Sequence, residues 1–262
     1  MSCMNIPGPR IGCDGKPITD VICSFSSGGR ENYNKMLLRL IDSVVEHWFG
    51  DMLVYSPDHW LDEYKGVKIR KGWPQPKGIA SLTHSEMPYQ FKTALIQEAL
   101  EMGYERIIWL DSSMQLKKDL TPLFNGDKGL TFFENLGHPT WKYLSDAAYH
   151  MLQRDGYFGP TAEFSDLKRI PQIWGGAFAL NFQELGAPTF FHELKEYSLN
   201  GSFKDGPSLT PGFVTHRHDQ AVMSVLLNDI KFTMLPYGHI LCPPHDRTGE
   251  YGNDPYLICR GL

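Results

Sequence analysis

The feature that most constrains this chain is an apolar run of strand length that stops on an acid. Residues 106–113 read Arg-Ile-Ile-Trp-Leu-Asp-Ser-Ser. A continuous apolar run is typical of a strand buried on both faces of an α/β sheet, and ligands bind beyond the carboxyl ends of such strands. The pattern therefore predicts a buried strand over 107–110 with Asp111 at the mouth of a crevice. Alternatively, Asp111 caps the next turn, because Asp and Ser both favour turns and helix starts.

The rest of the chain alternates strand-like and helix-like segments around this run. Such alternation predicts an α/β fold in which a mostly parallel central sheet carries helices on both faces. With 262 residues, 42% of them hydrophobic, the chain can form one large core, so we expect a single domain over 1–262 in which residues 1–17 are irregular. The predicted strands are 18–25, 52–55, 107–110, 130–134, 173–181 and 231–235, and the predicted helices are 32–48, 88–103, 140–153, 184–197 and 218–227.

Charge and composition exclude several classes of partner. The formal net charge of −5 argues against nucleic acid and anionic membrane surfaces, which select for a positive face. No apolar run approaches the roughly twenty residues that a bilayer span needs. The first ten residues carry Pro and Gly where a signal peptide has its apolar core, and the five cysteines form no C-x-x-C pair. We therefore expect a soluble, cytoplasmic protein with free thiols and no membrane span.

Two early segments are candidates to meet Asp111 at the carboxyl edge of the sheet. The first runs from Ser24 to Arg30, where backbone amides, hydroxyls and a cation could hold a nucleotide base or phosphate. A plain glycine turn explains it equally. The second is the start of the helix that carries Lys92, which is either within reach of a diphosphate or a surface lysine. No dinucleotide or P-loop glycine motif is present, so neither a dehydrogenase nor a P-loop enzyme is predicted.

Two later segments complete the set of candidates. Trp174-Gly175-Gly176 interrupts a strand, and paired glycines there indicate either a bulge with a close ligand approach or tight strand packing. His216, His218 and Asp219 precede an apolar helix and can bind a metal or transfer protons. The alternative for Asp219 is a helix cap.

In this order the parts resemble nucleotide-sugar-dependent glycosyltransferases of the GT-A fold. In that family a strand ends in an Asp-x-Asp motif, often followed by a hydrophobic element. Here residues 109–124 read Trp-Leu-Asp-Ser-Ser-Met-Gln-Leu-Lys-Lys-Asp-Leu-Thr-Pro-Leu-Phe, so Asp111-Ser112-Ser113 is a degenerate motif. The resemblance spans roughly residues 18–245. It implies a hexosyl- or pentosyltransferase that moves a sugar from a UDP- or GDP-sugar to a hydroxyl of a glycan or other acceptor.

The resemblance also assigns roles by position. It places Ser24 to Ser27 near the nucleotide, Lys92 near the base or diphosphate, Gly175-Gly176 under the donor sugar, and Asp219 beside the donor or acceptor hydroxyl. The catalytic candidates are Asp219 and Asp111. The implied donor-binding residues are Ser24, Phe25, Ser26, Ser27, Arg30, Lys92, Asp111, Ser112, Ser113, Trp174, Gly175, Gly176, His218 and Asp219.

A divalent cation, Mn²⁺ or Mg²⁺, is the implied cofactor, held by Asp111 and Ser113 with His245 or His239 as a further ligand. Ser113 stands where the family has its second acid, and a hydroxyl is a poorer ligand for these ions than a carboxylate. Two other functions stay open from the residues. One is a metal-dependent hydrolase that uses His216, His218 and Asp219, and the other is a non-catalytic glycan-binding domain.

Overall fold

Most predicted elements form where the sequence places them. The computed structural model describes residues 8–13, 15–26, 31–77, 79, 84, 86–158, 166–241 and 255–259. Within these residues the strands are β1 (Asp20–Phe25), β2 (Asp51–Tyr55), β3 (Glu63–Tyr64), β4 (Val67–Arg70), β5 (Arg106–Leu110), β6 (Met114–Leu116), β7 (Leu130–Pro139), β8 (Pro171–Asn181), β9 (Thr233–Leu235), β10 (Ile240–Leu241) and β11 (Leu257–Cys259). The α-helices are α1 (Glu31–His47), α2 (Gln90–Glu101), α3 (Asp146–Arg154), α4 (Gly186–Asn200) and α5 (His218–Leu226).

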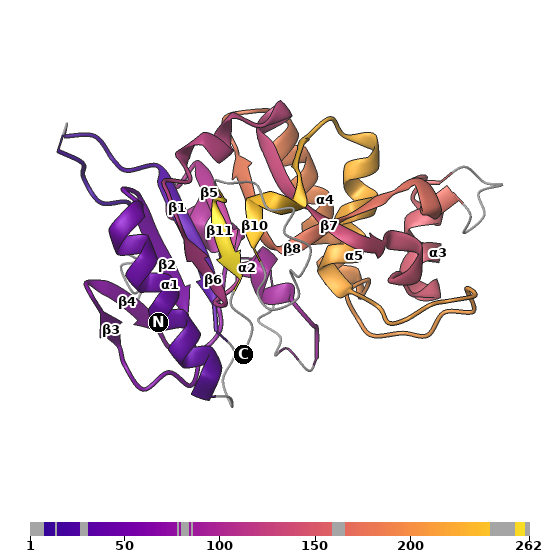
Figure 1. The fold of residues 1–262 in the computed structure, drawn as a ribbon, viewed down its shortest axis with the longest axis horizontal. Coiled ribbons are helices and arrows are strands. Elements are labelled where there is room, and N and C mark those ends of the chain that lie inside the picture. The colour runs from indigo at the N-terminus through magenta and orange to yellow at the C-terminus, as the bar shows by residue number, and fades with distance from the viewer. Residues whose placement is uncertain are drawn as a thin grey trace.

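The central sheet has eight strands in the order β3-β4-β2-β1-β5-β8-β7-β9 and extends along the long axis of the molecule (Figure 1). β1 is parallel to β2 and β5, β2 is parallel to β4, and β7 is parallel to β9. β8 runs antiparallel to both β5 and β7, and β3 is antiparallel to β4. The sheet is therefore mixed, and the predicted parallel arrangement describes the β4-β2-β1-β5 part and the β7–β9 pair.

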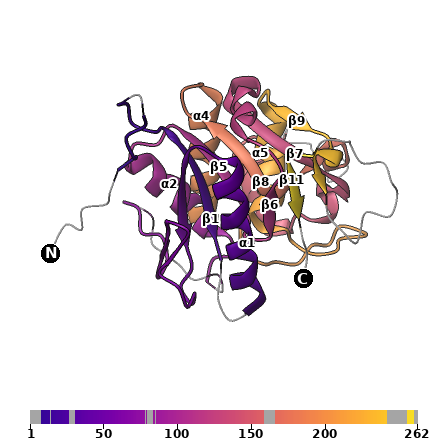
Figure 2. The same cartoon turned by 60° about the vertical axis from the view of Figure 1, so that its left-hand side comes forward.

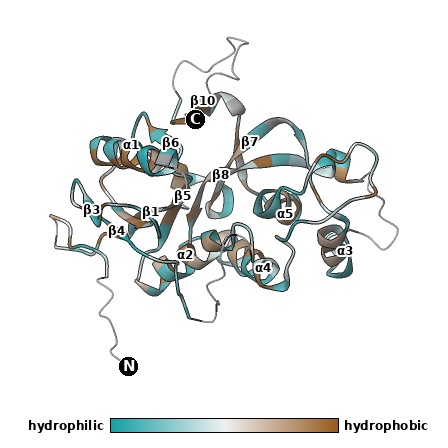
Figure 3. Ribbon diagram, turned by 90° about the horizontal axis from the view of Figure 1, so that it is seen from below, coloured by the Kyte–Doolittle hydropathy of each residue, from teal (hydrophilic) through white to brown (hydrophobic). Residues whose placement is uncertain are grey.

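Helices cover both faces of this sheet. Seen nearly edge-on, α1 and β6 lie on one face, and α2, α4 and α5 lie on the other (Figure 3). Figure 2 shows α1 running along the face of β1 and β5 that is turned to the viewer. The alternation along β5 follows from this arrangement, because successive strand residues point to opposite faces. Ile107 and Trp109 join the core under α2, whereas Ile108 and Leu110 join the core under α1.

The helix predicted over 140–153 begins later than expected. Residues Thr140–Lys142 form a 3₁₀ turn, and α3 starts only after Ser145, whose Oγ accepts the N–H of Ala148 at 3.3 Å. The carbonyl of Tyr143 accepts the N–H of Arg217 at 2.9 Å instead of a helical partner. Because a serine at the N-cap satisfies a free helical N–H, it fixes the start of the helix at this point.

A second, three-stranded sheet with the order β10-β11-β6 has no counterpart in the sequence prediction. It packs beside α1, where the N–H of Leu116 donates to Ser43 Oγ at 3.0 Å. The thiols of Cys13, Cys23 and Cys259 are free, as expected. Among the described residues, none of the helices combines the length and apolar character that crossing a bilayer requires.

Candidate active site

Asp111 lies directly beyond β5, on the face of the sheet that α2 covers. Its N–H donates to the carbonyl of Gly176 at 2.8 Å, and the indole Nε1–H of Trp109 donates to its Oδ1 at 2.8 Å. The Asp111 side chain is 38% exposed and lines a cleft of about 360 Å³. An acid at the accessible mouth of a crevice beyond a buried strand is the position that the sequence analysis expects.

Lys92 lies beneath the cleft and is not a surface residue. Its side chain is 4% exposed, and its Nζ lies 2.8 Å from Asp219 Oδ2 and 3.6 Å from Asp111 Oδ1. Nζ also donates to the carbonyl of Gly175 at 2.6 Å. Nζ thus makes one hydrogen bond, to Gly175, and two ion pairs, with Asp219 and Asp111. The surface alternative for Lys92 is therefore wrong.

The charges of this trio are set by burial and by one another. Burial alone would lower the pKa of Lys92, but the carboxylates of Asp111 and Asp219 outweigh it and raise that pKa, so the ammonium stays charged. Burial raises the pKa of Asp219 above its ordinary value, although the charge of Lys92 opposes this shift. With both carboxylates ionised, Lys92, Asp111 and Asp219 together carry one net negative charge. We call these three residues the Lys92 triad.

The glycine pair faces the triad because β8 bulges at this point. Phe132 pairs with Phe178 and Glu134 pairs with Ile173, so β8 advances by five residues where β7 advances by two. A Cβ on Gly176 would lie 2.9 Å from Asp111 Oδ2, and one on Gly175 would lie 3.0 Å from the Cβ of Gln220. Real Cβ atoms essentially never approach as closely as the first distance, and the second is tighter than most real Cβ contacts, so glycine at both positions avoids displacing these neighbours. The predicted bulge is present.

His216 is buried and serves the fold. Its Nδ1 accepts the N–H of Ser145 at 3.2 Å, so the ring proton lies on Nε2, which donates to the carbonyl of Ser202 at 2.9 Å. Burial lowers the pKa of His216 to about 4. Both ring nitrogens are therefore occupied in a neutral imidazole, which leaves neither for a metal or a substrate proton.

Two residues in left-handed backbone conformations meet at the rim of the cleft. Tyr89 has φ 60° and His218 has φ 38°, and their ring centroids lie 5.1 Å apart. His218 Nδ1 bonds to the carbonyl of Phe203 at 2.8 Å. Non-glycine residues rarely adopt this conformation, and such strain gathers at functional sites. The cleft lining also includes Thr215, Arg217 and Gln220, and the sequence assigns no role to these three or to Tyr89, although all four lie in the candidate segments around Lys92 and Asp219.

The first predicted segment lies at the carboxyl end of β1, next to β5 in the sheet. Ser24 and Ser26 are buried, and neither hydroxyl has a hydrogen-bond partner among the described residues. Phe25 stacks on Phe91 with ring centroids 4.3 Å apart. Ser27 and Arg30 lie outside the described residues.

The predicted metal ligands do not converge on Asp111 within the described part of the chain. Ser112 is buried, and Ser113 Oγ lies 3.8 Å from Cys259 Sγ, beside the Met114–Cys259 pair of the small sheet. His239 precedes Ile240, which pairs with Leu257 at the other end of β11. His245 lies outside the described residues. No group of three His, Cys, Asp or Glu side chains suited to a metal ion occurs among the described residues.

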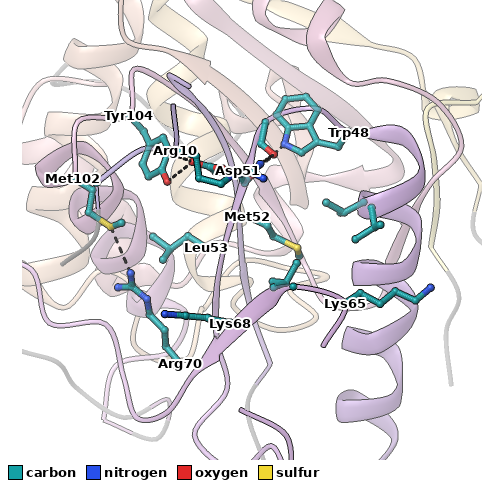
Figure 4. A pocket seen from close by; sticks show the side chains of 16 residues that line it. Arg10, Trp48, Asp51, Met52, Leu53, Lys65, Lys68, Arg70, Met102 and Tyr104 are labelled. Carbon is teal, nitrogen blue, oxygen red and sulfur yellow. Dashed lines mark hydrogen bonds and ion pairs between the residues drawn. The ribbon is translucent and has the colours of Figure 1, made fainter. Parts of the chain in front are cut away.

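A larger cavity of about 500 Å³ lies away from the cleft, near the start of β2 and the residues that precede β5 (Figure 4). Its walls include Trp48, Met52 and Leu53, and its cations are mostly neutralised. Arg10 is paired with Asp51, Lys65 Nζ lies 2.7 Å from Asp42 Oδ1, and Arg70 Nη1 lies 2.6 Å from Glu98 Oε1. The cavity shares no lining residue with the cleft.

Comparison with known proteins identifies the fold. No protein-family model matches the chain, and no curated protein matches it. A solved structure of WbbM, described as a bifunctional glycosyltransferase in its apo form, superimposes over 98% of this chain with a TM-score of 0.54 and 14% sequence identity. The match spans 48% of that neighbour, so this chain corresponds to about half of it. The chain therefore has a fold found in a glycosyltransferase.

Proposed function

We propose that this chain is a glycosyltransferase that moves a sugar from a nucleotide-sugar donor, a UDP- or GDP-sugar, to a hydroxyl of a glycan or other acceptor. The observation that carries the proposal is the Lys92 triad beneath the Gly175-Gly176 bulge, in an open cleft at the carboxyl end of a buried strand. The shared fold with a glycosyltransferase supports the same reaction class.

The charge of the triad indicates how a donor would lie. Because Lys92 is buried and faces two carboxylates and a carbonyl of the protein, its positive charge is already offset by protein groups and attracts a diphosphate only weakly. Carboxylate oxygens attract sugar hydroxyls and repel phosphate. The sugar hydroxyls would therefore face Asp111 Oδ2 and Asp219 across the bare backbone of the glycines. The diphosphate would lie farther out, toward the Ser24 to Arg30 segment that the family resemblance assigns to the nucleotide.

The reaction then needs one bond to break and one to form at the anomeric carbon. The bond from that carbon to the diphosphate oxygen breaks and its electron pair leaves with the nucleotide, while the acceptor oxygen forms the new bond and gives up its proton. If the configuration inverts, Asp219 is the candidate base, because burial raises its pKa toward the range in which a carboxylate accepts protons effectively. If the configuration is retained, Asp219 would bind the sugar instead.

The role of Mn²⁺ or Mg²⁺ stays a prediction from the resemblance. Among the described residues only Asp111 offers a carboxylate oxygen at the expected place, since Ser113 faces Cys259 and His239 lies at the far end of the small sheet. This set does not fit a divalent cation, so no step above uses one. The geometry of His216 likewise does not favour the hydrolase alternative, because both of its ring nitrogens bond to the backbone.

The test is a panel of UDP- and GDP-sugars, measured by calorimetric binding and by release of nucleoside diphosphate, with Mn²⁺ and with EDTA. We expect at least one sugar nucleotide to bind and to be slowly hydrolysed or transferred. The Asp111→Asn variant should lose roughly a hundredfold in turnover, the usual cost of removing a charged group from a reacting centre. Asp127→Asn is the matched control, because Asp127 is a half-exposed carboxylate paired with Lys231. No binding across the panel in either buffer would refute the proposal.

A further inference from the structure

A basic and aromatic surface adjoins the cleft on the side of α5 and α3. It consists of Trp141, Lys142, Tyr143, Lys168 and Arg217, and we call it the Trp141 patch. Its 3₁₀ turn at Thr140–Lys142 lies in the chain between β7 and α3, toward the α3 end of the molecule (Figure 1).

Backbone hydrogen bonds join this patch to the wall of the cleft. The N–H of Val214 donates to the carbonyl of Lys142 at 2.9 Å, and the N–H of Arg217 donates to the carbonyl of Tyr143 at 2.9 Å. Thr215, His216 and Arg217, in the same segment, line the cleft. The patch and the cleft therefore adjoin and share Arg217, so a ligand longer than one sugar could reach from one to the other.

The cations of the patch make cation–π contacts with aromatic rings, and no described carboxylate forms an ion pair with them. The ammonium groups of Lys142 and Lys168 lie 5.2 and 5.5 Å from the centre of the Trp141 indole, and the guanidinium of Arg217 lies 5.0 Å from the centre of the Tyr143 ring. Within the described part of the chain, no carboxylate pairs with any of these three cations. In the larger cavity near the start of β2, by contrast, Arg10 and Arg70 each have an acidic partner.

The carboxylates of the described residues therefore leave the positive charge of the patch unneutralised. Lys142 and Lys168 share one ring, so their ammonium groups lie within about one Debye length and repel each other. His138, whose Nδ1 is 2.8 Å from the Tyr143 hydroxyl, lies close enough to be affected by the charge of Arg217. Burial lowers the pKa of His138, and the charge of Arg217 lowers it further.

We propose that the Trp141 patch binds the acceptor and that the acceptor is an acidic saccharide, a sugar chain that carries carboxylate or phosphate groups. This inference rests on the proposed function. The indole offers a flat apolar face to a sugar ring, and a charge-assisted bond to an anion is stronger than an exposed cation–π contact, so the lysines can turn from the ring to the ligand. The negative triad receives the reacting hydroxyl, while the acidic groups lie on the patch.

The test measures binding of a trigalacturonate, a phosphorylated trisaccharide and a neutral trisaccharide of equal length by calorimetry. A Lys142→Gln/Lys168→Gln/Arg217→Gln variant should lose at least about tenfold in affinity for the acidic probe that binds, because three charge-assisted contacts disappear. Its affinity for the neutral probe should stay the same. Lys65→Gln/Lys68→Gln/Lys117→Gln removes the same charge elsewhere and should bind as the parent does. Circular dichroism and thermal unfolding check that each variant folds.

The outcomes separate this inference from the proposed function. Acidic saccharides that bind the patch variant as tightly as the parent overturn it, even if a sugar nucleotide is turned over. Binding to vesicles of anionic lipid without binding to acidic trisaccharides also overturns it. Patch-dependent binding of an acidic trisaccharide together with sugar-nucleotide turnover supports it. Patch-dependent binding when no nucleotide sugar binds shows a saccharide site but overturns both the proposed function and the role of that saccharide as its acceptor. Whether trigalacturonate or the phosphorylated probe binds identifies the acidic group.

Discussion

Replacing Lys92 by methionine tests whether one ammonium holds the two carboxylates of the site together. The substitution keeps a long side chain of similar volume and removes only the charge. At 2.8 Å the gross attraction between Lys92 and Asp219 is about 6 kcal/mol at an effective dielectric constant near 20, and desolvation of the two groups offsets much of it. Removing one partner leaves the other buried without compensation, which costs about 3–5 kcal/mol.

The pH dependence of the lost stability identifies Asp219 as the carboxylate that is left unpaired. Without Lys92, the pKa of Asp219 rises further above its ordinary value, because the charge of Lys92 then no longer opposes burial and the charge of Asp111. The folded variant therefore binds more protons than the unfolded chain between the unfolded pKa of about 3.9 and the raised folded pKa. Its free energy of unfolding must increase as the pH falls through this window, by up to about 1.4 kcal/mol per pH unit.

Urea unfolding at pH 5, 6, 7 and 8 measures how far the free energy of unfolding of Lys92→Met falls below that of the parent, and we call this difference the deficit. We expect about 3–5 kcal/mol at pH 8 and clearly less at pH 5. Adding Asp219→Asn to Lys92→Met should recover about 1–3 kcal/mol at pH 8, because the unpaired charge is gone. Lys65→Met is the control, since Lys65 is 49% exposed and its surface pair is worth at most about 1 kcal/mol. A deficit under about 1 kcal/mol, or one that does not change with pH, would refute the reasoning.

Three further results are expected. Gly176→Ala should lower turnover at least roughly tenfold in the nucleotide-release assay while the chain stays folded, because its Cβ displaces Asp111 and Trp174. Unfolding free energy should fall by up to about 3 kcal/mol from pH 6.5 to pH 4 as His216 is forced to charge, and His216→Gln should lack this part of the loss, measured by urea titration. Any tightening of UDP binding by Mn²⁺ in calorimetry should vanish in Asp111→Asn and persist in Asp127→Asn.

Local pattern predicted the elements whose signal lies within one stretch of chain. The apolar run before Asp111 became β5, and the periodic apolar positions before Gly50 became α1. The direction of β8 cannot be predicted from local pattern, because it depends on partners in β5 and β7 that lie 32 to 75 residues away in the chain. β6 and β11 are three residues long and pair across about half of the chain, which gives no local periodicity to detect.

The residues of the site can be divided in the same way, into those that local sequence indicates and those that depend on contacts between distant segments. The sequence indicated Asp111, Asp219 and the glycine pair, because each has an unusual residue type for its position in a strand or at a helix start. The burial of Lys92 and the occupied ring of His216 follow from contacts between distant segments. The Lys92–Gly175 hydrogen bond spans 83 residues and the His216–Ser145 bond spans 71. A lysine in an apolar helix is a surface residue by default until the acids that pair with it are placed.

Under the proposed function, the distribution of charge around the cleft limits the orientation in which an acceptor can lie. With both carboxylates ionised the triad is negative, so it attracts hydroxyls and a proton and repels phosphate or a second carboxylate. The Trp141 patch is positive and joins the cleft wall at Arg217. An acceptor with a hydroxyl at one end and an acid at the other fits this polarity in one orientation only, since reversing it would place its anion on Asp111. Under the two proposals, the layout that orients an acidic acceptor also selects which of its hydroxyls reaches Asp219.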